Sequence, residues 1–260
     1  MNTDTVICVV ADFSYLFKYF KIFKENIRTK GKYQGEIVII TSFTAPTFLF
    51  PSIFFDKKIK IKRFKKIIFS DYADQKLRNL NTKGQPNRHL TKQFQWQKFN
   101  LFDKSMKEWK YIFYLDINMK IHHDINFILK IKPKNLLFAR SDSYPEYSKS
   151  LISQFDQTDN LIKKLNFEFD LTIKNYFQTG ILYFDSSIIK NSTIKDLVKL
   201  VEKYPITITN EQAIMNLYFI YIRKCYKELP FETEGGFSYY YWKLKDKKII
   251  ITKQTVEQYK

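Results

Sequence analysis

The chain has 260 residues, of which 45% are hydrophobic and 18% are aromatic, and this composition excludes an intrinsically disordered protein. Its 44 lysines and arginines outnumber its 26 aspartates and glutamates, which gives a formal net charge of +18. This charge fits a polyanionic partner such as a nucleic acid, or an anionic substrate such as a nucleotide. It also fits an A/T-rich coding sequence, since Lys, Ile, Asn, Phe and Tyr are all frequent.

The first third of the chain has a pattern typical of a parallel α/β sheet. Residues 5–11 form a continuous apolar run rich in β-branched side chains, which predicts a strand covered on both faces. Residues 13–28 place apolar side chains at helical spacing, and residues 35–43 form a second apolar run. We therefore predict a β-α-β unit, followed by a third strand within residues 59–69 and a polar loop over residues 79–88.

The remaining two thirds continue this alternation. A helix is predicted over residues 90–109, and a buried strand begins at Tyr111 and runs into an acidic residue, Asp116. The further predicted elements are strands at residues 135–139, 180–185, 227–231 and 248–252, and helices at residues 196–204 and 210–222. Because strands alternate with helices without an intervening linker, we expect one α/β domain over residues 1–260, with a mainly parallel mixed sheet flanked by helices.

The sequence also bears on location and redox state. No basic region followed by a leader-length apolar stretch begins the chain, and no apolar run is long enough to span a bilayer. We therefore expect a cytoplasmic protein without a transmembrane segment. Cys8 and Cys225 have neither metal-binding nor redox spacing, and Cys8 lies in the first apolar run, where we expect a small buried side chain.

The functional residues should lie where the strands end, because ligands of open α/β sheets bind beyond the carboxyl ends of the strands. Asp116 and Asn118 follow the apolar run that starts at Tyr111, and side chains two positions apart in a strand point to the same side. Two oxygen-bearing side chains there can hold Mg²⁺ or Mn²⁺, which in turn bridges to phosphate oxygens. The alternative is an acidic residue that merely ends the strand in an Asx turn.

Five segments occur in the order found in a known group of enzymes. They are VVADFSY at residues 9–15, TKQFQWQKF at 91–99, YLDINM at 114–119, YFQTGILYFD at 176–185 and NEQAIMN at 210–216. In this order they resemble glycosyltransferase family eight, the glycogenin-like group. The resemblance implies a GT-A fold and transfer of a sugar from a nucleoside diphosphate sugar, with UDP preferred. The acceptor would be a hydroxyl group of a glycan or protein. The resemblance implies that the configuration is retained, and the alternative is an inverting relative with Glu211 or another carboxylate as the base.

The resemblance assigns the donor side of the site. It implies that Ala11 and Asp12 line the nucleotide base pocket and that Tyr15 stacks on or flanks the base. Lys98 stands near the family's basic residue that contacts the donor, and a cation there stabilises the leaving group as its charge develops. Without the resemblance, Tyr15 is an ordinary aromatic at a helix start and Lys98 a solvated lysine. Further candidates for the phosphate contact are Arg88 and Lys92.

The resemblance also assigns the sugar side. It implies that Asp142 helps to hold the transferred sugar, although an aspartate beside serine and proline also favours a turn. Gln178 and the two residues after it would line the sugar and acceptor space, and Gly180 lets the backbone approach closely.

Glu211 and Gln212 match the family's D-Q pair at a helix start, with Glu in place of Asp. Glu211 would act as a catalytic base or orient the sugar hydroxyls. The alternative is structural: Asn210 caps the helix, and Glu211 favours its first turn through the helix dipole.

Two departures from the family pattern concern the cation. Asn118 offers a neutral carbonyl oxygen where the family has a second carboxylate, which should lower the affinity for Mn²⁺ or Mg²⁺. The family's late histidine ligand is missing, and the nearest segment offers Glu232 or Glu234. His122 and His123 are expected at a turn or on the surface. Either a substitute ligand completes a weak cation site, or lysines and arginines neutralise the pyrophosphate and the cation is dispensable.

Three functions are therefore compared. The first is a glycosyltransferase that uses a nucleoside diphosphate sugar. The second is a catalytically inactive sugar-nucleotide binder, which Asn118 and the missing histidine would explain. The third is a basic nucleic-acid-binding protein, suggested by the net charge and by aromatic residues interleaved with lysines. The basic residues are spread along the chain and no nucleic-acid-binding motif is present, so we expect no nucleic-acid partner.

Overall fold

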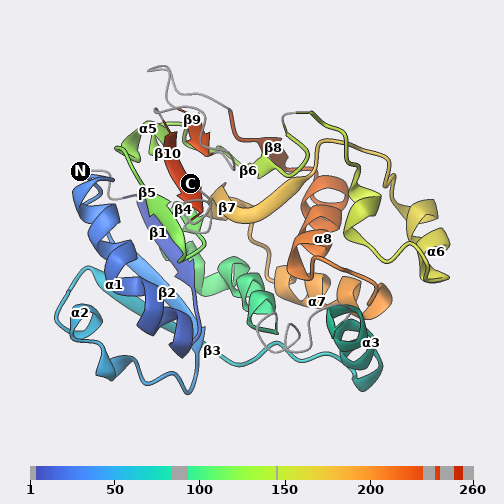
Figure 1. The fold of residues 1–260 in the computed structure, drawn as a ribbon, viewed down its shortest axis with the longest axis horizontal. Helices are drawn as coiled ribbons and strands as arrows, with labels where there is room; N and C mark the ends of the chain where they lie inside the picture. Colours follow the sequence, from blue (N-terminus) through green and yellow to red (C-terminus); the bar gives the residue numbers. More distant parts are fainter. Residues whose placement is uncertain (1–3, 83–92, 145, 231–237, 241–248, 254–260) are drawn as a thin grey trace.

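The computed structural model describes residues 4–82, 93–144, 146–230, 238–240 and 249–253. Within these residues, the main sheet has seven strands in the order β3-β2-β1-β4-β7-β6-β8 (Figure 1). These strands are β1 (Thr5–Val10), β2 (Ile37–Ser42), β3 (Ile59–Phe64), β4 (Tyr111–Leu115), β6 (Leu137–Ser141), β7 (Phe177–Asp185) and β8 (Tyr226–Glu228). A smaller sheet has the order β5-β10-β9 and contains β5 (Met119–Ile121), β9 (Ser238–Tyr240) and β10 (Ile249–Lys253).

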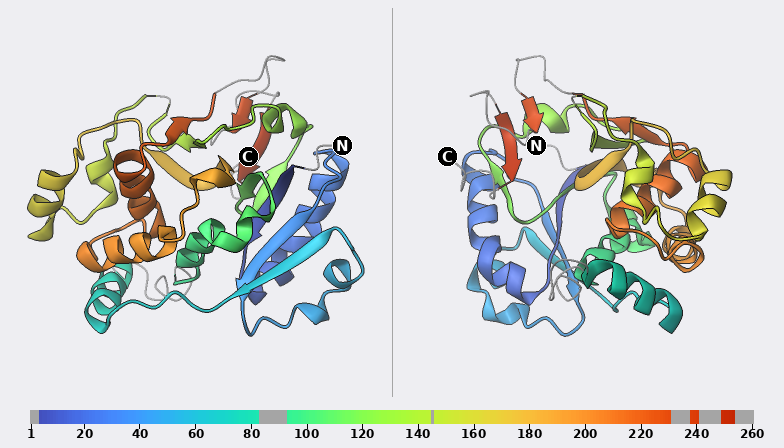
Figure 2. Two further views of the ribbon diagram at one scale, coloured as in Figure 1. Left: turned by 180° about the vertical axis from the view of Figure 1, so that it is seen from behind. Right: turned by 45° about the vertical axis from the view of Figure 1, so that its right-hand side comes forward.

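Helices cover both faces of the main sheet (Figure 2). One face is covered by α1 (Phe13–Thr29), and the other by a group that includes η2 (Gln93–Phe102), α7 (Thr193–Lys203) and α8 (Glu211–Asn216). The other elements are η1 (Thr47–Leu49), α2 (Pro51–Phe54), α3 (Asp71–Thr82), η3 (Lys104–Glu108), α5 (Asn126–Leu129), η4 (Leu151–Gln154), α6 (Leu161–Glu168), η5 (Ser186–Ile188) and the π-helix η6 (Leu217–Ile222).

Strand β1 explains the continuous apolar run at the start of the sequence. Val6, Cys8 and Val10 belong to the core beneath η2, α7 and α8. Ile7 and Val9 belong to the core beneath α1. Because both sets of alternating side chains are buried, every position of the strand is apolar or small. Cys8 is fully buried, as expected, and this burial raises the pKa of its thiol.

The strand directions place several strand ends at one edge of the sheet. β1, β2, β3 and β4 are parallel, β7 is antiparallel to β4 and β6, and β8 is parallel to β6. This confirms the predicted mixed, mainly parallel sheet. Because β7 is antiparallel, its first half meets the carboxyl end of β4, where the Asp116 amide donates a hydrogen bond to the Gly180 carbonyl at 2.9 Å. The ends of β1 and β4 and the first half of β7 therefore share one edge.

Two predicted helices differ from the structure in kind. From residue 93 onward, the predicted helix over 90–109 consists of two 3-10 helices, η2 and η3. They separate at Asp103, whose carboxylate accepts a hydrogen bond from the Ser105 amide at 2.8 Å. Every residue from Trp96 to Phe102 is buried, so η2 lacks the polar face of an amphipathic α-helix. The predicted helix over 210–222 begins as α8 and continues as the π-helix η6.

The predicted loop over residues 79–88 is wrong in its first part, because α3 extends to Thr82. Residues 83–88 lie outside the described residues. α3 is mostly polar, and it buries Ala73 and Leu77. Because most residues of α3 are polar, the composition of this segment is close to that of a loop, which is why the sequence pattern did not indicate a helix. Among the described residues, no helix combines the length and apolar character needed to cross a bilayer.

Candidate functional site

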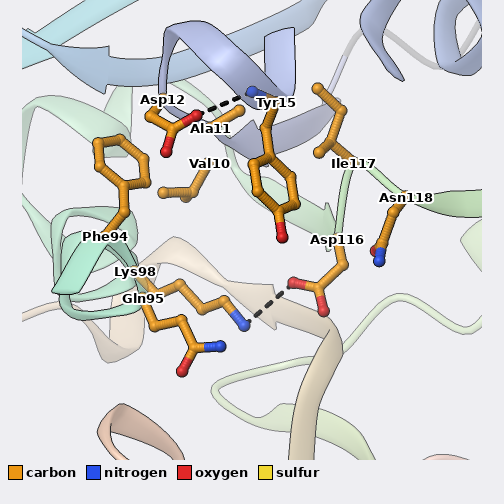
Figure 3. A pocket seen from close by; sticks show the side chains of 10 residues that line it. All are labelled: Val10, Ala11, Asp12, Tyr15, Phe94, Gln95, Lys98, Asp116, Ile117 and Asn118. Carbon is orange, nitrogen blue, oxygen red and sulfur yellow. Dashed lines mark hydrogen bonds and ion pairs between the residues drawn. The ribbon is translucent and has the colours of Figure 1, made fainter. Parts of the chain in front are cut away.

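A pocket opens at the edge where β1 and β4 end (Figure 3). The residues that line it are Val10, Ala11, Asp12, Tyr15, Phe94, Gln95, Lys98, Asp116, Ile117 and Asn118. They come from the β1–α1 corner, from η2 and from the turn after β4. Its volume is about 200 Å³. Because sites that enclose a drug-sized ligand occupy about 300–1,000 Å³, the described residues can bury part of a nucleotide sugar.

The pocket brings together most of the residues predicted for the donor side. Those that line it are Ala11, Asp12, Tyr15, Lys98, Asp116 and Asn118. Arg88 and Lys92, predicted for the phosphates, and Glu232 and Glu234, considered as substitute cation ligands, lie outside the described residues.

Asp12 and Tyr15 form the β1–α1 corner of the pocket. The Asp12 carboxylate accepts a hydrogen bond from the Tyr15 amide at 2.8 Å and thereby caps α1. The Tyr15 side chain remains 41% exposed beside the pocket. Burial, together with the neighbouring Tyr19 and Asp12, raises its pKa, so the phenol stays neutral. A neutral, accessible ring in this position can stack on a planar ligand.

Lys98 is the charged centre of the pocket. Its side chain is 9% exposed, and its Nζ lies 3.0 Å from Asp116 Oδ1 and 3.0 Å from Glu211 Oε1. It also donates hydrogen bonds to the carbonyl and hydroxyl oxygens of Thr179, both at 3.4 Å. Burial by itself would lower the pKa of Lys98, but the two carboxylates outweigh this effect and raise it above its ordinary value. The buried side chain therefore stays charged.

Asp116 lies one residue beyond β4, in a turn. The Met119 amide donates to the Asp116 carbonyl at 2.9 Å, so the backbone has left the extended conformation before it reaches Asn118. Both side chains still line the pocket, through the turn and not through the alternation of a strand. The Tyr114 hydroxyl donates a hydrogen bond to Asp116 Oδ1. Burial and the Asp116 charge raise the pKa of Tyr114 well above its ordinary value, so the phenol remains a donor.

Glu211 reaches Lys98 from the start of α8. It is 2% exposed, and its Oε1 also accepts a hydrogen bond from the Thr179 hydroxyl at 2.8 Å. Its second oxygen, Oε2, is buried and has no hydrogen-bond partner among the described residues. An unpaired carboxylate oxygen in a buried position is costly unless a ligand supplies a donor. Glu211 therefore has the capacity to accept one further hydrogen bond.

The backbone just before Glu211 is strained. Asn210 has a φ of 52°, and a non-glycine residue in a sparsely populated conformation costs about 1–3 kcal/mol. The alternative in which Asn210 caps the helix is wrong, because its side chain makes no cap hydrogen bond. Its amide instead donates to Gln95 Oε1 at 2.9 Å, and its oxygen accepts from Asn81 at 2.9 Å. These contacts join the start of α8 to η2 and α3.

A hydrogen-bonded chain links Gln212 to Asp142. The Gln212 amide nitrogen donates to Asp142 Oδ2 at 3.3 Å and to Gln154 Oε1 at 2.8 Å, and Gln154 donates to the same carboxylate oxygen at 3.2 Å. On its other side, Gln212 Oε1 accepts a hydrogen bond from the Thr179 amide at 3.2 Å. Gln212 therefore connects the residue after β6 to β7, beside the Lys98 contacts.

Gly180 lies between Asp116 and Gln178. A Cβ built on Gly180 would lie 3.5 Å from Asp116 Oδ2, 3.8 Å from Gln178 Oε1 and 2.9 Å from Met119 Cε. The missing side chain thus leaves room beside both oxygens. Of the residues predicted for catalysis, Asp142, Glu211 and Gln212 are joined by these hydrogen bonds through Thr179, and Gln178 lies beside Gly180. These four residues are not among those that line the pocket.

Asp116 and Asn118 are the two residues predicted to hold a divalent cation. Asp116 Oδ1 is engaged by Lys98 and Tyr114, so these residues offer Asp116 Oδ2 and the Asn118 amide oxygen. Within the described part of the chain, no group of three or more His, Cys, Asp or Glu side chains could hold a metal ion. Two hard oxygen donors fit Mg²⁺ or Mn²⁺ that shares its coordination with ligand phosphates, and they do not fit an ion enclosed by protein ligands.

Some residues of the site were not predicted from the sequence. Tyr114 stands two positions before Asp116 and could have been found by extending the strand period by one step. The contacts of Gln95 and Asn210 have no local signal, because their partners come from distant segments. His122 lies 2.7 Å from the Thr252 hydroxyl of β10, in the smaller sheet, and does not line the pocket.

Comparison with known proteins identifies the fold. No known protein family matches the sequence, and no curated protein matches it. The bifunctional glycosyltransferase WbbM, in its apo structure, matches with a TM-score of 0.60 and 13% identity, over 98% of this chain and 46% of that chain. The galactosyltransferase LgtC, in complex with donor and acceptor sugar analogues, matches with a TM-score of 0.56 and 13% identity, over 86% and 72% of the two chains.

The glycosyltransferase GlyE of Streptococcus pneumoniae TIGR4 also matches, with a TM-score of 0.51 and 14% identity, over 88% of this chain and 45% of that chain. These likenesses show that the chain has the GT-A fold that the sequence predicted. The chain spans about half the length of WbbM and of GlyE. At this level of identity the likeness shows the fold alone, and membership of glycosyltransferase family eight stays a prediction.

Proposed function

We propose that the chain is a glycosyltransferase that moves a sugar from a nucleoside diphosphate sugar, with UDP as the nucleotide, to a hydroxyl group of a glycan or protein acceptor. The observation that carries the proposal is a buried charge cluster at the ligand edge of a GT-A sheet, in which Lys98 Nζ lies 3.0 Å from both Asp116 and Glu211. The three matching structures, all described as glycosyltransferases, support the same activity.

The donor would lie across the pocket. Tyr15 and Ala11 would hold the base at the β1–α1 corner, since the Tyr15 ring is accessible there. Lys98 and Asp116 lie across the pocket from Asp12 (Figure 3), and this is the side proposed for the diphosphate. The Lys98 ammonium is buried and stays charged at neutral pH, so it interacts with phosphate more strongly than a lysine in water would.

In the described part of the site, carboxylates outnumber ammonium groups, and this favours the binding of a cation together with the donor. Among the described residues, the carboxylates of Asp12, Asp116 and Glu211 accompany the single ammonium of Lys98. A diphosphate brings further negative charge, so a further cation would favour its binding here. We propose Mg²⁺ or Mn²⁺, held by Asp116 Oδ2 and Asn118 together with the diphosphate. Such an ion supplies Lewis-acid stabilisation of the leaving group.

In the transfer, the bond between the sugar C1 and the diphosphate oxygen breaks, and the acceptor oxygen forms a new bond to C1 as it loses its proton. Lys98 would stabilise the charge that develops on the departing diphosphate, the largest expected contribution of the protein. Glu211 would accept the proton of the acceptor on Oε2, its available atom. If Glu211 instead accepts a hydrogen bond from the sugar, the acceptor proton would pass to the departing diphosphate oxygen. Retention of configuration is proposed from the family resemblance.

The same network would position the sugar. Asp142, Gln178 and Gln212 are the residues proposed to hold it. Because Gln212 bridges Asp142 and the Thr179 amide, displacement of one would move the others, so these residues act as a unit.

A donor panel tests the proposal. UDP-, GDP- and TDP-sugars are incubated with the chain, with and without Mn²⁺, and release of the nucleoside diphosphate is measured together with the thermal shift. We expect release with a UDP-sugar, loss of release in Asp116→Asn and unchanged release in the exposed control Asp71→Asn. Absence of both turnover and thermal shift with every donor would refute the function, and full activity of Asp116→Asn would refute the site. The anomeric configuration of the product, read by NMR, tests retention.

A second function is favoured by one observation, the small number of cation donors. Asn118 replaces a carboxylate, and the described residues contain no three-ligand group. An inactive sugar-nucleotide binder would show a thermal shift with UDP-sugars but neither hydrolysis nor transfer with any acceptor. The donor panel therefore separates the two candidates.

A further inference from the structure

The helix that begins beside the pocket has exposed apolar side chains in its first turns. Helix α1 buries Leu16, Phe20, Phe23 and Ile27 against the sheet. This one stripe is what a helix that covers a sheet requires. Phe13 extends the stripe at the start of the helix and is 38% exposed, and Phe17, one turn later, lies beside the stripe and is 76% exposed.

The segment that contains η1 and α2 continues this apolar surface. The ring centre of Phe50 lies 5.5 Å from that of Phe13 and 6.5 Å from that of Phe17. Lys24 of α1 forms an ion pair with Asp56 at 3.0 Å, so the segment lies alongside the helix (Figure 1). Its exposed apolar side chains are Phe43, Phe48, Leu49 and Phe55, from 57% to 79% exposed. We call α1 and residues 43–58 together the α1–α2 surface.

The α1–α2 surface is also positively charged. Over α1 and residues 43–58, six lysines and arginines accompany two acidic residues. One of the two, Asp56, is paired with Lys24. Lys18, Lys21 and Lys57 are exposed among the apolar side chains. Accessible phenylalanines interspersed with lysines form the pattern of an interfacial, lipid-binding surface.

We propose that the α1–α2 surface docks on an anionic lipid bilayer, with its phenylalanines in the interface and its lysines against the headgroups. Phe and Leu side chains have no polar atom with which to hydrogen-bond a saccharide. The lysines complement an anionic surface, and each adds electrostatic attraction to it. A cluster of exposed apolar side chains on a protein surface marks an interaction site. Charge complementarity therefore selects the bilayer over a neutral glycan.

This docking does not depend on the proposed function, but it bears on the acceptor. Phe13 directly follows Asp12, which lines the pocket. If both proposals hold, the donor pocket opens beside the bilayer, and the acceptor is presented at a lipid surface.

Vesicle sedimentation tests the docking without any donor or turnover. The chain is mixed with vesicles of phosphatidylcholine alone, or of phosphatidylcholine and phosphatidylglycerol in equal amounts. The double variant Phe17→Glu/Phe55→Glu removes the two most exposed rings of the surface and adds repulsive charge. The control is Phe167→Glu, which changes a ring that is 92% exposed on α6, at the opposite end of the molecule (Figure 1). Circular dichroism and thermal melting establish that all variants are folded.

We expect binding to the anionic vesicles, at least about tenfold weaker binding by Phe17→Glu/Phe55→Glu, and unchanged binding by Phe167→Glu. Binding that is equal on neutral vesicles would overturn the proposed role of the lysines. Absence of binding to anionic vesicles, or equal loss in both variants, would overturn the docking itself. A dimer in light scattering that Phe17→Glu/Phe55→Glu dissociates, without vesicle binding, would show that a second copy of the chain covers the surface instead.

Discussion

Replacement of Lys98 by alanine provides the sharpest test of the site. Its ammonium lies 3.0 Å from one oxygen of Asp116 and 3.0 Å from one oxygen of Glu211, and its side chain is 9% exposed. Removal of the lysine leaves two poorly solvated carboxylates facing each other. Loss of one partner of a buried ion pair costs about 3–5 kcal/mol, and for a chain of this size that corresponds to a fall in Tm of about 6–20 °C.

The pH dependence of Lys98→Ala follows from the same charges. In the native chain the pKa of Lys98 is raised, so its stabilising contribution is fully present below the unfolded pKa of about 10.4 and is lost only as the pH rises through the higher folded value. The difference in Tm between the native chain and the variant should therefore be constant from neutral to mildly alkaline pH, and it should shrink only as the pH rises through the folded pKa of Lys98.

Thermal melting over a pH series measures this difference, with Lys104→Ala, an exposed lysine of η3, as the matched control. The double variant Lys98→Met/Glu211→Gln, which removes the cation together with one carboxylate, should recover much of the stability. It should not recover transfer, because loss of the charge that stabilises the leaving group lowers kcat by about 10²–10³-fold. If Lys98→Ala melts within about 2 °C of the native chain, or if its deficit in Tm changes between neutral and mildly alkaline pH, the buried charge cluster is not as described.

Three further substitutions test the pocket. Tyr15→Ala should raise KM for the donor about 5- to 150-fold through the loss of base stacking, whereas Tyr15→Phe should be nearly neutral; equal effects would contradict stacking. Gly180→Ala places a Cβ 3.5 Å from Asp116 Oδ2, so kcat/KM should fall by up to about 10²-fold. Tm should change little, because the atom closest to this Cβ is the end of the flexible Met119 side chain. Asn118→Asp should lower the Mn²⁺ concentration required for donor binding in calorimetry, and Asn118→Ala should raise it; no change in either variant would mean that no cation binds at Asn118.

The fold was largely predictable because the strands of this sheet are buried on both faces. β1 needs apolar side chains at every position, and this produces a run that local patterning detects. α3 was missed for the complementary reason, since this mostly polar helix buries only two apolar side chains, Ala73 and Leu77, and its composition is close to that of a loop. The hydrophobic periodicity of the sequence also could not predict that η2 is a 3-10 helix. Its side chains from Trp96 to Phe102 are buried all round, and burial of this kind depends on elements that pack from several directions.

The site was predictable in its members but not in its contacts. Asp116 and Asn118 were named from the end of the predicted strand and Lys98 from the family resemblance, and all three line the pocket. The sequence could not indicate that Lys98 also meets Glu211, because this contact depends on how α8 packs against η2. Nor could it indicate the unusual backbone of Asn210, which is held by side chains of two distant elements. Long-range contacts of this kind have no local signature.

These contacts suggest how the charge cluster would respond to a donor. Lys98 is already neutralised by two carboxylates, so it cannot serve a diphosphate at full strength while both stay in place. Glu211 is fixed by Thr179 and by the strained backbone before it, whereas Asp116 lies in a turn and is partly exposed. A cation on Asp116 Oδ2 would weaken the hold of Asp116 on Lys98 and free one side of the ammonium for phosphate. Cation and donor should therefore bind cooperatively, and calorimetry should show tighter UDP binding in the presence of Mn²⁺ in the native chain but not in Asp116→Asn.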